Sequence, residues 1–168
     1  MKLAAFEAVA QALNAAQVRY LVAGGLAVNA HGYIRLTVDI DLAIALDAAN
    51  IQRAFKALHS IGYRPSVPID ADAFSHSEQR QRWRDEKGMQ VLNFFSDEFP
   101  GTSVDVFVYE PFNFTSEHAA SLCAELLPGI EVRFISIPTL IAMKKIAGRP
   151  RDLDDIQHLE WLQEHPHD

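Results

Sequence analysis

The sequence predicts a single α+β domain in which helices pack against a mixed, twisted central sheet. Segments with the period of an amphipathic helix alternate with short runs rich in β-branched and aromatic residues. A chain of 168 residues with 49% apolar and 22% charged residues fits one globular domain with a sizeable core. No repeat or linker divides the chain. We therefore expect residues 1–168 to form one unit, with a core over about 18–110 that C-terminal helices over about 137–164 complete.

The first half of the chain alternates between predicted helices and strands. A helix is predicted over about 3–16, where apolar residues recur with the helical period: Leu3, Phe6, Val9 and Leu13. The strand "VRYLVA" leads into Gly24-Gly25, and a short helix carries "LAVNAHG". A strand over about 37–46 follows. Asp47 is predicted to cap the next helix, "AANIQRAFKALHSIG", which ends at Gly62.

The second half continues the alternation. The polar segment "DADAFSHSEQRQRWRDEKG" is predicted to be helical in part and to end at Gly88. "MQVLNFF" and "SVDVFVY" are predicted strands around a turn at Pro100-Gly101. A helix near 115–126 and a strand "IEVRFIS" follow, and Pro138 suits the first turn of the helix "PTLIAMKKIAG". The last helix is predicted to open near Asp152, with four residues at core spacing: Leu153, Ile156, Leu159 and Leu162.

Composition narrows the classes of protein. The formal net charge of −7 argues against indiscriminate binding to nucleic acid, although it allows a local basic patch or a metal ion that screens carboxylates. No apolar run approaches the roughly 20 residues of a membrane span, and the N-terminus is typical of an amphipathic helix rather than a signal peptide. The single Cys123 excludes an internal disulfide and a cysteine-built zinc site. We expect a cytoplasmic protein.

Two aspartates, Asp39 and Asp41, stand one residue apart in a strand that otherwise has the composition of buried core. Side chains alternate along a strand, so both carboxylates project from one face, with Cα atoms about 6.6 Å apart, while Ile40 and Leu42 face the core. An unpaired buried carboxylate is costly, and two neighbouring carboxylates raise each other's pKa. A hard divalent cation, Mg²⁺ or Mn²⁺, resolves both problems, and Mg²⁺ favours carboxylates combined with substrate phosphates.

Two further features favour a metal–phosphate site. Gly24-Gly25 ends a strand and opens a helix, which leaves backbone N–H groups free to hold phosphate oxygens. Asp105 is a third acid, in the otherwise apolar "VDVFVY". Each feature alone has an ordinary explanation: a solvated edge strand for the aspartate pair, a tight turn for the glycines, and an arginine partner for Asp105. Together they favour one site in which Asp39, Asp41 and Asp105 bind metal.

The motifs "VAGG", "DID" at 39–41 and Asp105 in "VDVF" stand in an order that resembles the nucleotidyltransferases of the DNA polymerase beta superfamily. The fuller string "GGLAVNAHGYIRLTVDIDL" is similar to the AbiEii-type and related minimal nucleotidyltransferases of bacteria. In those proteins a late lysine on a helix precedes an R-x-R/K-D-x-x-D-like segment. The matching residues here are Lys144 or Lys145 in "IAMKKIAG" and "RPRDLDDI" at 149–156. The similarity spans about residues 18–160.

This resemblance implies a nucleotidyltransferase fold and the transfer of a nucleoside monophosphate from an NTP in the presence of Mg²⁺. It assigns Asp39 and Asp41 to the metal that bridges the triphosphate. It assigns Asp105 to a second metal site and to activation of the attacking nucleophile.

The resemblance also implies which residues hold the nucleotide. Gly24 and Gly25 would bind the β- and γ-phosphates through their N–H groups, and Lys144 would offer positive charge as pyrophosphate leaves. Many relatives have serine at the second glycine, so a hydroxyl donor to the phosphate is missing from this turn.

The late helices leave several assignments open. Lys144 and Lys145 point about 100° apart on a helix, so only one can face the site, and Lys145 is the alternative to Lys144. Either could be a simple surface residue. Asp152 is interpreted as an N-cap, and Asp155 as the i,i+4 partner of Arg151. A role for either aspartate in positioning Lys144 is the second interpretation.

Three other features are ambiguous. Arg35 precedes the aspartates and is interpreted either as a phosphate ligand or as a surface residue. Thr37 is expected on the strand face of Asp39, where it would support a carboxylate. The run "RQRWRDEK" predicts a basic helix face beside Trp83 that either contacts RNA or is simply solvated, and its basic residues are Arg80, Arg84 and Lys87.

Two hypotheses of function remain. The first is an Mg²⁺-dependent nucleotidyltransferase whose acceptor, by resemblance alone, is the 3′ end of tRNA, a protein or an antibiotic, with a cognate antitoxin as a further partner. The second is a non-catalytic nucleotide- or partner-binding module with the same fold, which the retention of three acids disfavours. A glycosyltransferase also uses D-x-D, but that fold places a larger nucleotide-binding half before the motif, and only 38 residues precede Asp39 here.

Overall fold

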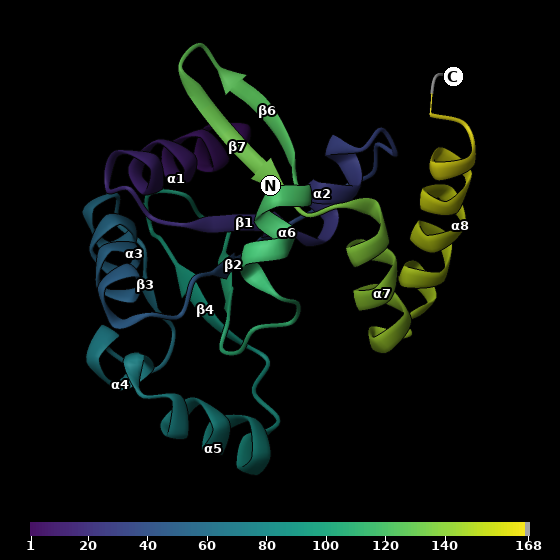
Figure 1. The fold of residues 1–168 in the computed structure, drawn as a ribbon. Helices are drawn as coiled ribbons and strands as arrows, with labels where there is room; N and C mark the ends of the chain where they lie inside the picture. The colour runs from purple at the N-terminus through teal and green to yellow at the C-terminus, as the bar shows by residue number, and fades with distance from the viewer. Residues whose placement is uncertain (167–168) are drawn as a thin grey trace.

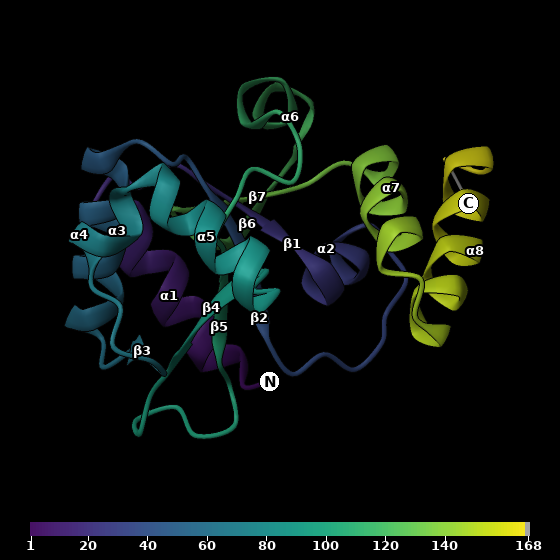
Figure 2. The ribbon, with the colours of Figure 1, turned by 90° about the horizontal axis from the view of Figure 1, so that it is seen from below.

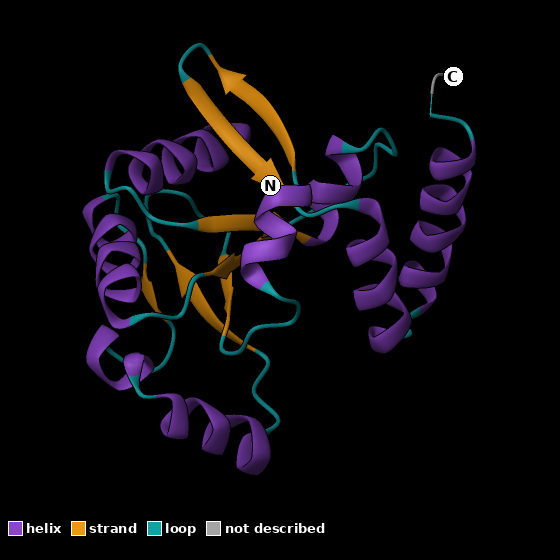
Figure 3. Ribbon diagram, in the orientation of Figure 1, coloured by secondary structure: helices purple, strands orange, loops and turns teal. Residues whose placement is uncertain are grey.

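A computed structural model describes residues 1–166 and contains a seven-stranded mixed sheet flanked by helices (Figures 1 and 3). The strand order is β3-β4-β5-β2-β1-β7-β6. The strands are β1 (Tyr20–Ala23), β2 (Ile40–Ile44), β3 (Arg64–Pro65), β4 (Val91–Phe95), β5 (Val104–Phe107), β6 (Leu122–Leu127) and β7 (Ile130–Phe134). The predicted α+β class with a mixed central sheet is confirmed.

Eight helices surround the sheet in the described part of the chain. They are α1 (Leu3–Ala15), α2 (Gly24–Ala30), α3 (Ala48–Ser60), α4 (Ala71–Ser75), α5 (Ser77–Lys87), α6 (Phe114–Ala120), α7 (Ile137–Ala147) and α8 (Pro150–Glu164). Figures 1 and 2 show α3 and α4 at one end of the molecule and the α7–α8 pair at the other, with α2 between the sheet and α7. Within residues 1–166, none of these helices has the length and apolar character needed to traverse a bilayer.

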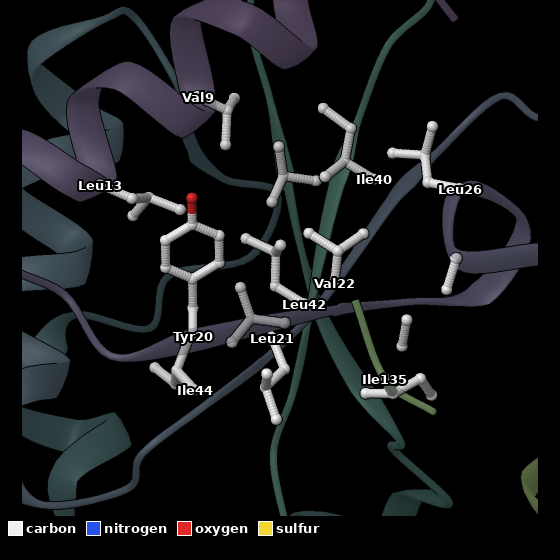
Figure 4. Close-up of a cluster of buried hydrophobic side chains, with 14 of the residues drawn as sticks. Val9, Leu13, Tyr20, Leu21, Val22, Leu26, Ile40, Leu42, Ile44 and Ile135 are labelled. Carbon is white, nitrogen blue, oxygen red and sulfur yellow. The ribbon is translucent and has the colours of Figure 1, made fainter. Parts of the chain in front are cut away.

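The central strands have one apolar face and one polar face. Ile40 and Leu42 of β2 and Val106 of β5 are almost fully buried, and Figure 4 shows Val9 and Leu13 of α1 facing this side of the sheet. The alternate residues Asp41 and Asp105 lie on the opposite face. This alternation was predictable from the sequence, and it concentrates the acidic residues on a single side of the sheet.

The pairing of β2 brings the acidic residues into register. β2 runs antiparallel to β1, where Ala23 is opposite Asp41, and parallel to β5, where Asp105 is opposite Asp41. β4 then places Asn93 opposite Asp105. The polar row Asp41–Asp105–Asn93 therefore crosses three adjacent strands, and it begins beside the turn from β1 into α2.

The predicted strand over 37–46 is shorter in the structure, since β2 starts only at Ile40. The preceding residues are not paired with another strand. Instead, the side chain of Asn29 bonds both the backbone N–H and C=O of Arg35, and the N-terminal amine donates to the carbonyl of Thr37. Side chains and the chain terminus thus satisfy backbone groups that a sheet ladder would otherwise pair. Thr37 consequently lies outside the strand.

The predicted helix near 115–126 is wrong in its second half. α6 ends at Ala120, and residues 122–127 form β6, which pairs antiparallel with β7. Alanine, glutamate and leucine favour a helix here, but the hairpin with β7 overrides that local propensity. The hairpin turns at Gly129, whose φ of +82° suits glycine.

The last helix also differs from its prediction. α8 begins at Pro150, with Arg149 as its N-cap residue, so Asp152 is not the N-cap but lies in the first turn. Leu153 is 59% exposed, whereas Ile156 and Leu159 are buried. Because the buried side of α8 also carries charged residues, the apolar spacing alone misplaced Leu153 in the core. Residues 167 and 168 lie outside the described residues.

Candidate active site

The three predicted acids come together on the polar face of the sheet. Asp41 and Asp105 are direct neighbours across the β2–β5 pair, and Asp39 immediately precedes β2. Burial, followed by the charges of Asp105 and Asp39, raises the pKa of Asp41 to about 6. Burial also raises the pKa of Asp105, and the charge of Asp39 adds to this, against a hydrogen bond that lowers it. The carboxylates therefore repel one another at neutral pH.

Two uncharged side chains orient the outer carboxylates. The Ser103 hydroxyl donates to Asp39 Oδ1 over 2.7 Å, and the Asn93 amide donates to Asp105 Oδ1 over 2.7 Å. Asp105 is thus paired with an amide rather than with the arginine considered from the sequence. A neutral donor fixes the carboxylate without cancelling its charge. The remaining charge stays available to a cation.

Gly24 gives Asp41 room at the turn from β1 into α2. A Cβ atom on Gly24 would lie 2.0 Å from Asp41 Oδ2, and the φ of Gly24 is +61°. Both facts require glycine, because an L side chain would be strained and would displace the carboxylate. α2 has no side-chain cap at its N-terminus. The first N–H groups of α2 therefore lie beside Asp41 without a capping partner.

Gly25 lies against the extended segment that precedes β2. A Cβ atom there would be 2.6 Å from Thr37 Oγ1 and 3.1 Å from an Arg35 guanidinium nitrogen. Serine at this position would collide with Thr37. The Thr37 hydroxyl instead occupies the space next to the turn, although its own hydrogen bond in the structure, 3.5 Å long, goes to the backbone carbonyl of Asp39 rather than to a carboxylate.

Lys144 and Arg35 meet at one buried carboxylate. Asp155 has 0% side-chain exposure, and its two oxygens accept bonds from Arg35 Nε at 2.7 Å and Nη2 at 2.8 Å. Lys144 Nζ lies 2.7 Å from Asp155 Oδ2 and 3.5 Å from Asp152 Oδ1. The positive charge of Lys144 lowers the pKa of Asp41. The ammonium group, held by Asp155, therefore acts on the carboxylate row, which consists of Asp39, Asp41 and Asp105.

This network corrects two interpretations. Asp155 pairs with Arg35 and Lys144, not with Arg151. Arg35 is not a surface residue, since its side chain is 15% exposed and a third nitrogen, Nη1, donates to the carbonyl of Leu36. With these nitrogens engaged inside the protein, Arg35 connects the segment before β2 to α8.

Lys145 points away from this network. Its side chain is 62% exposed and lies 4.0 Å from Glu160, whereas the side chain of Lys144 is 7% exposed. Arg149, by contrast, adds positive charge near the carboxylates. It bonds Asp152 at 2.7 Å and lowers the pKa of Asp41.

The basic run on α5 is not one solvated face. Arg80 is buried, and its guanidinium donates to the carbonyl of Phe74. Arg84 lies over the ring of Tyr109, 3.7 Å from its centroid. Trp83 is also buried, whereas Lys87 is exposed. Arg80, Arg84 and Lys87 lie on one helical face by their spacing, but each has different surroundings in the structure.

The site contains residues that sequence reasoning missed. Asn93 and Ser103 orient the acids, and Arg149, which the late motif contains without an assigned role, adds charge beside Asp41. Asn93 carried a signal, because a polar residue interrupts the otherwise apolar run "VLNFF". Ser103 carried none, since a serine at the start of a strand is ordinary.

A carboxylate cluster of this kind suits a hard cation whose remaining ligands come from a substrate. Within residues 1–166 no group of three or more His, Cys, Asp and Glu side chains forms a ready-made metal cage. Mg²⁺ is commonly bound through one or two carboxylates together with waters and substrate phosphates. Burial and the neighbouring acids raise the pKa of Asp41, so a cation beside this carboxylate would offset the cost of its charge.

A family model described as "Nucleotidyl transferase AbiEii toxin, Type IV TA system" matches residues 9–165. No curated protein matches the chain in sequence.

Solved structures with the same fold include antibiotic-modifying enzymes. ANT(2″)-Ia in complex with adenylyl-2″-tobramycin is 13% identical at a TM-score of 0.59, and the alignment covers 94% of this chain and 86% of that one. The lincosamide antibiotic adenylyltransferase LnuA, bound to lincomycin, is 14% identical at a TM-score of 0.53, over 88% and 89% of the two chains. An antigenic nucleotidyltransferase-like protein from Paracoccidioides brasiliensis is 16% identical at a TM-score of 0.56, over 89% and 71%.

Proposed function

Because this chain belongs to the AbiEii nucleotidyl transferase family, we propose that it transfers a nucleoside monophosphate from an NTP to an acceptor at the carboxylate row of Asp39, Asp41 and Asp105. The observation that carries this proposal is the register of β2 and β5, which sets Asp41 directly opposite Asp105. Asp41 also lies opposite Ala23, the last residue of β1 before the uncapped turn at Gly24-Gly25. Carboxylates and free N–H groups are thus adjacent, as a metal-bound triphosphate requires.

In this proposal Asp39 and Asp41 hold Mg²⁺ or Mn²⁺ with the triphosphate, and Asp105 completes a second metal position. Bound metal would neutralise negative charge that develops on the entering and leaving oxygens. Gly24 and Gly25 contact the phosphates through backbone N–H groups. Lys144 places its ammonium beside the row, where it stabilises the departing pyrophosphate.

Arg35 and Lys145 were both expected to bind nucleotide, and their surroundings support different roles. The bidentate contact with Asp155 supports a positioning role for Arg35, because Asp155 also holds Lys144. The exposure of Lys145 supports no direct contact with the carboxylate row.

The first test is nucleotide binding and label transfer. We expect any NTP that serves as substrate to raise the melting temperature of the protein when Mg²⁺ is present. We also expect label from an α-³²P NTP to appear on an acceptor in total RNA or total protein. Asp39→Asn should abolish both effects. Asp97→Asn, which changes an 81% exposed side chain, should preserve them. No thermal shift and no transfer with any of the four NTPs would overturn the proposal.

The acceptor we propose is the 3′ end of an RNA such as tRNA, with a growth-inhibiting, toxin-like outcome that a cognate antitoxin would oppose. Membership of a family named for toxins supports this. If the label appears on protein or on an aminoglycoside and not on RNA, this acceptor is wrong although the transferase proposal stands. If labelled NTP binds without any transfer, the alternative of a non-catalytic nucleotide-binding module is correct.

A further inference from the structure

A pocket of about 760 Å³ opens between α5 and the edge of the sheet. Its walls come from α4 and α5, from the segment after β3, and from β4. The pocket reaches the active site through Asn93, which lines it and also donates to Asp105 Oδ1. The pocket and the polar row Asp41–Asp105–Asn93 therefore share one residue, Asn93.

The sheet edge at this pocket is open. β3 pairs only with Phe94 and Phe95 of β4, and after it Ser66 N–H bonds the carbonyl of Asn93. Val91 lies two residues before Asn93, so its backbone N–H and C=O point to the same edge of β4 as those of Asn93. No further strand is paired with this edge beside Val91 in the described residues. Backbone donors and acceptors are therefore available at the rim of the pocket.

The lining is apolar and aromatic, with one lysine at the rim. Trp83, Met89 and Ile69 provide apolar surface, and Lys87 and His76 are exposed basic residues. None of the residues that line the pocket is acidic, although the chain contains 22 acidic residues. The walls of the pocket therefore offer no counter-charge to a polycationic amino sugar. A flat ring with an attached anion is well matched.

We propose that this pocket is the acceptor subsite, and that it takes a heterocyclic base of an acceptor nucleotide whose phosphate lies near Lys87. The backbone at the β4 edge would bond the polar edge of the base, while Trp83 and Met89 contact its ring. Asn93 then connects base binding to the orientation of Asp105, the acid placed nearest the acceptor. This inference rests on the proposed transferase function, because it supplies that reaction with its acceptor.

Direct binding tests the pocket without nucleotide or turnover. The chain has two tryptophans, so Trp161→Phe leaves Trp83 as the sole tryptophan fluorophore. The probes are 5′-phosphorylated RNA pentanucleotides with free 3′ hydroxyls, one ending in each base, and tobramycin as the polycation, all without Mg²⁺ or NTP. We expect saturable quenching by RNA and none by tobramycin.

Variants with matched controls locate the binding. Ala73→Phe fills the pocket and should weaken RNA binding at least tenfold, whereas the same change at exposed Ala49 on α3 should not. Lys87→Glu should weaken it about tenfold, and Lys56→Glu, at another exposed lysine on α3, should not. Because Lys87 is exposed, this second pair still tests the pocket if Ala73→Phe fails to fold.

The outcomes separate the two proposals. RNA binding that is unchanged by both Ala73→Phe and Lys87→Glu overturns the acceptor subsite. The acceptor subsite is also overturned if tobramycin alone quenches the fluorescence, or if none of the oligonucleotides does. RNA binding at the pocket without any label transfer overturns the transferase function instead. Transfer to RNA with full activity in both pocket variants leaves the transferase proposal standing and rejects the pocket.

Discussion

Lys144 Nζ lies 2.7 Å from Asp155 Oδ2, and Asp155 also accepts two bonds from Arg35. One fully buried carboxylate therefore joins α7, α8 and the segment that leads into β2. These three parts of the chain converge beside Asp41. The position of the lysine at the active site thus depends on a residue that does not belong to the carboxylate row.

Removing the shared carboxylate should destabilise the fold. Asp155→Asn removes the charge that Arg35 and Lys144 share and leaves Lys144 only its longer, 3.5 Å contact with Asp152, so we expect a loss of about 3–5 kcal/mol in the free energy of unfolding. Urea denaturation measures this. Glu160→Gln removes the partner of Lys145 in an exposed pair 4.0 Å apart and should cost at most about 1 kcal/mol. Equal losses in the two variants would contradict the network.

The two adjacent lysines should behave differently. Lys144→Met removes a charge that lowers the pKa of Asp41, so that pKa should rise, whereas Lys145→Met should leave it unchanged. Carboxyl ¹³C NMR titration of the metal-free protein measures the pKa directly. We also expect Lys144→Met to reduce transfer strongly, and Lys145→Met to change stability by less than about 0.5 kcal/mol. A shift in both variants would show that Lys145 also faces the row.

Stability should depend on pH through Asp41. Burial and the neighbouring acids raise its pKa to about 6 in the folded protein, so the folded state binds this proton more tightly than the unfolded chain does. The resulting destabilisation is present in full above about pH 6 and disappears as the pH falls below the unfolded value. In EDTA at pH 7.5, Asp41→Asn should therefore be more stable than the parent by roughly 1–3 kcal/mol.

The comparison between pH values tests whether the pKa of Asp41 is raised. This advantage of Asp41→Asn should shrink as the pH is lowered from 7.5 to 5, because the parent carboxyl becomes protonated. Thermal melts at several pH values follow the difference, with about 2–4 °C for each kcal/mol in a domain of this size. A constant difference would mean that the pKa of Asp41 is not raised in the folded protein. Mg²⁺ with NTP should stabilise only the parent.

Gly24 is expected to tolerate no side chain. Gly24→Ala would place its Cβ 2.0 Å from Asp41 Oδ2, so we expect displacement of the carboxylate and loss of nucleotide binding in addition to backbone strain. Gly88→Ala is the matched control, since Gly88 has the same φ of +61° but no atom within 4 Å of its Cβ position. Both should lose roughly 1–2 kcal/mol from the left-handed backbone, and only Gly24→Ala should lose the NTP-dependent thermal shift.

The polar row was largely predictable from sequence. A period of two places Asp39 and Asp41 on one side of a strand and Ile40 on the other, and the glycine pair directly after a strand indicates a turn that opens a helix. These are local rules that act over a few residues. The alternation of helices and strands predicted the α+β class in the same way.

Only the tertiary structure decided the partners of these residues. Asp155 and Arg35 are 120 positions apart, and their bond depends on α8 docking beside the segment before β2. The β6 strand exists because β7 pairs with it, although its own composition favours a helix. Contacts between distant segments depend on how whole elements pack, which the spacing of residues within one element does not specify. For this reason the acids could be found from the sequence, whereas the groups that hold Lys144 and Asp105 in place could not.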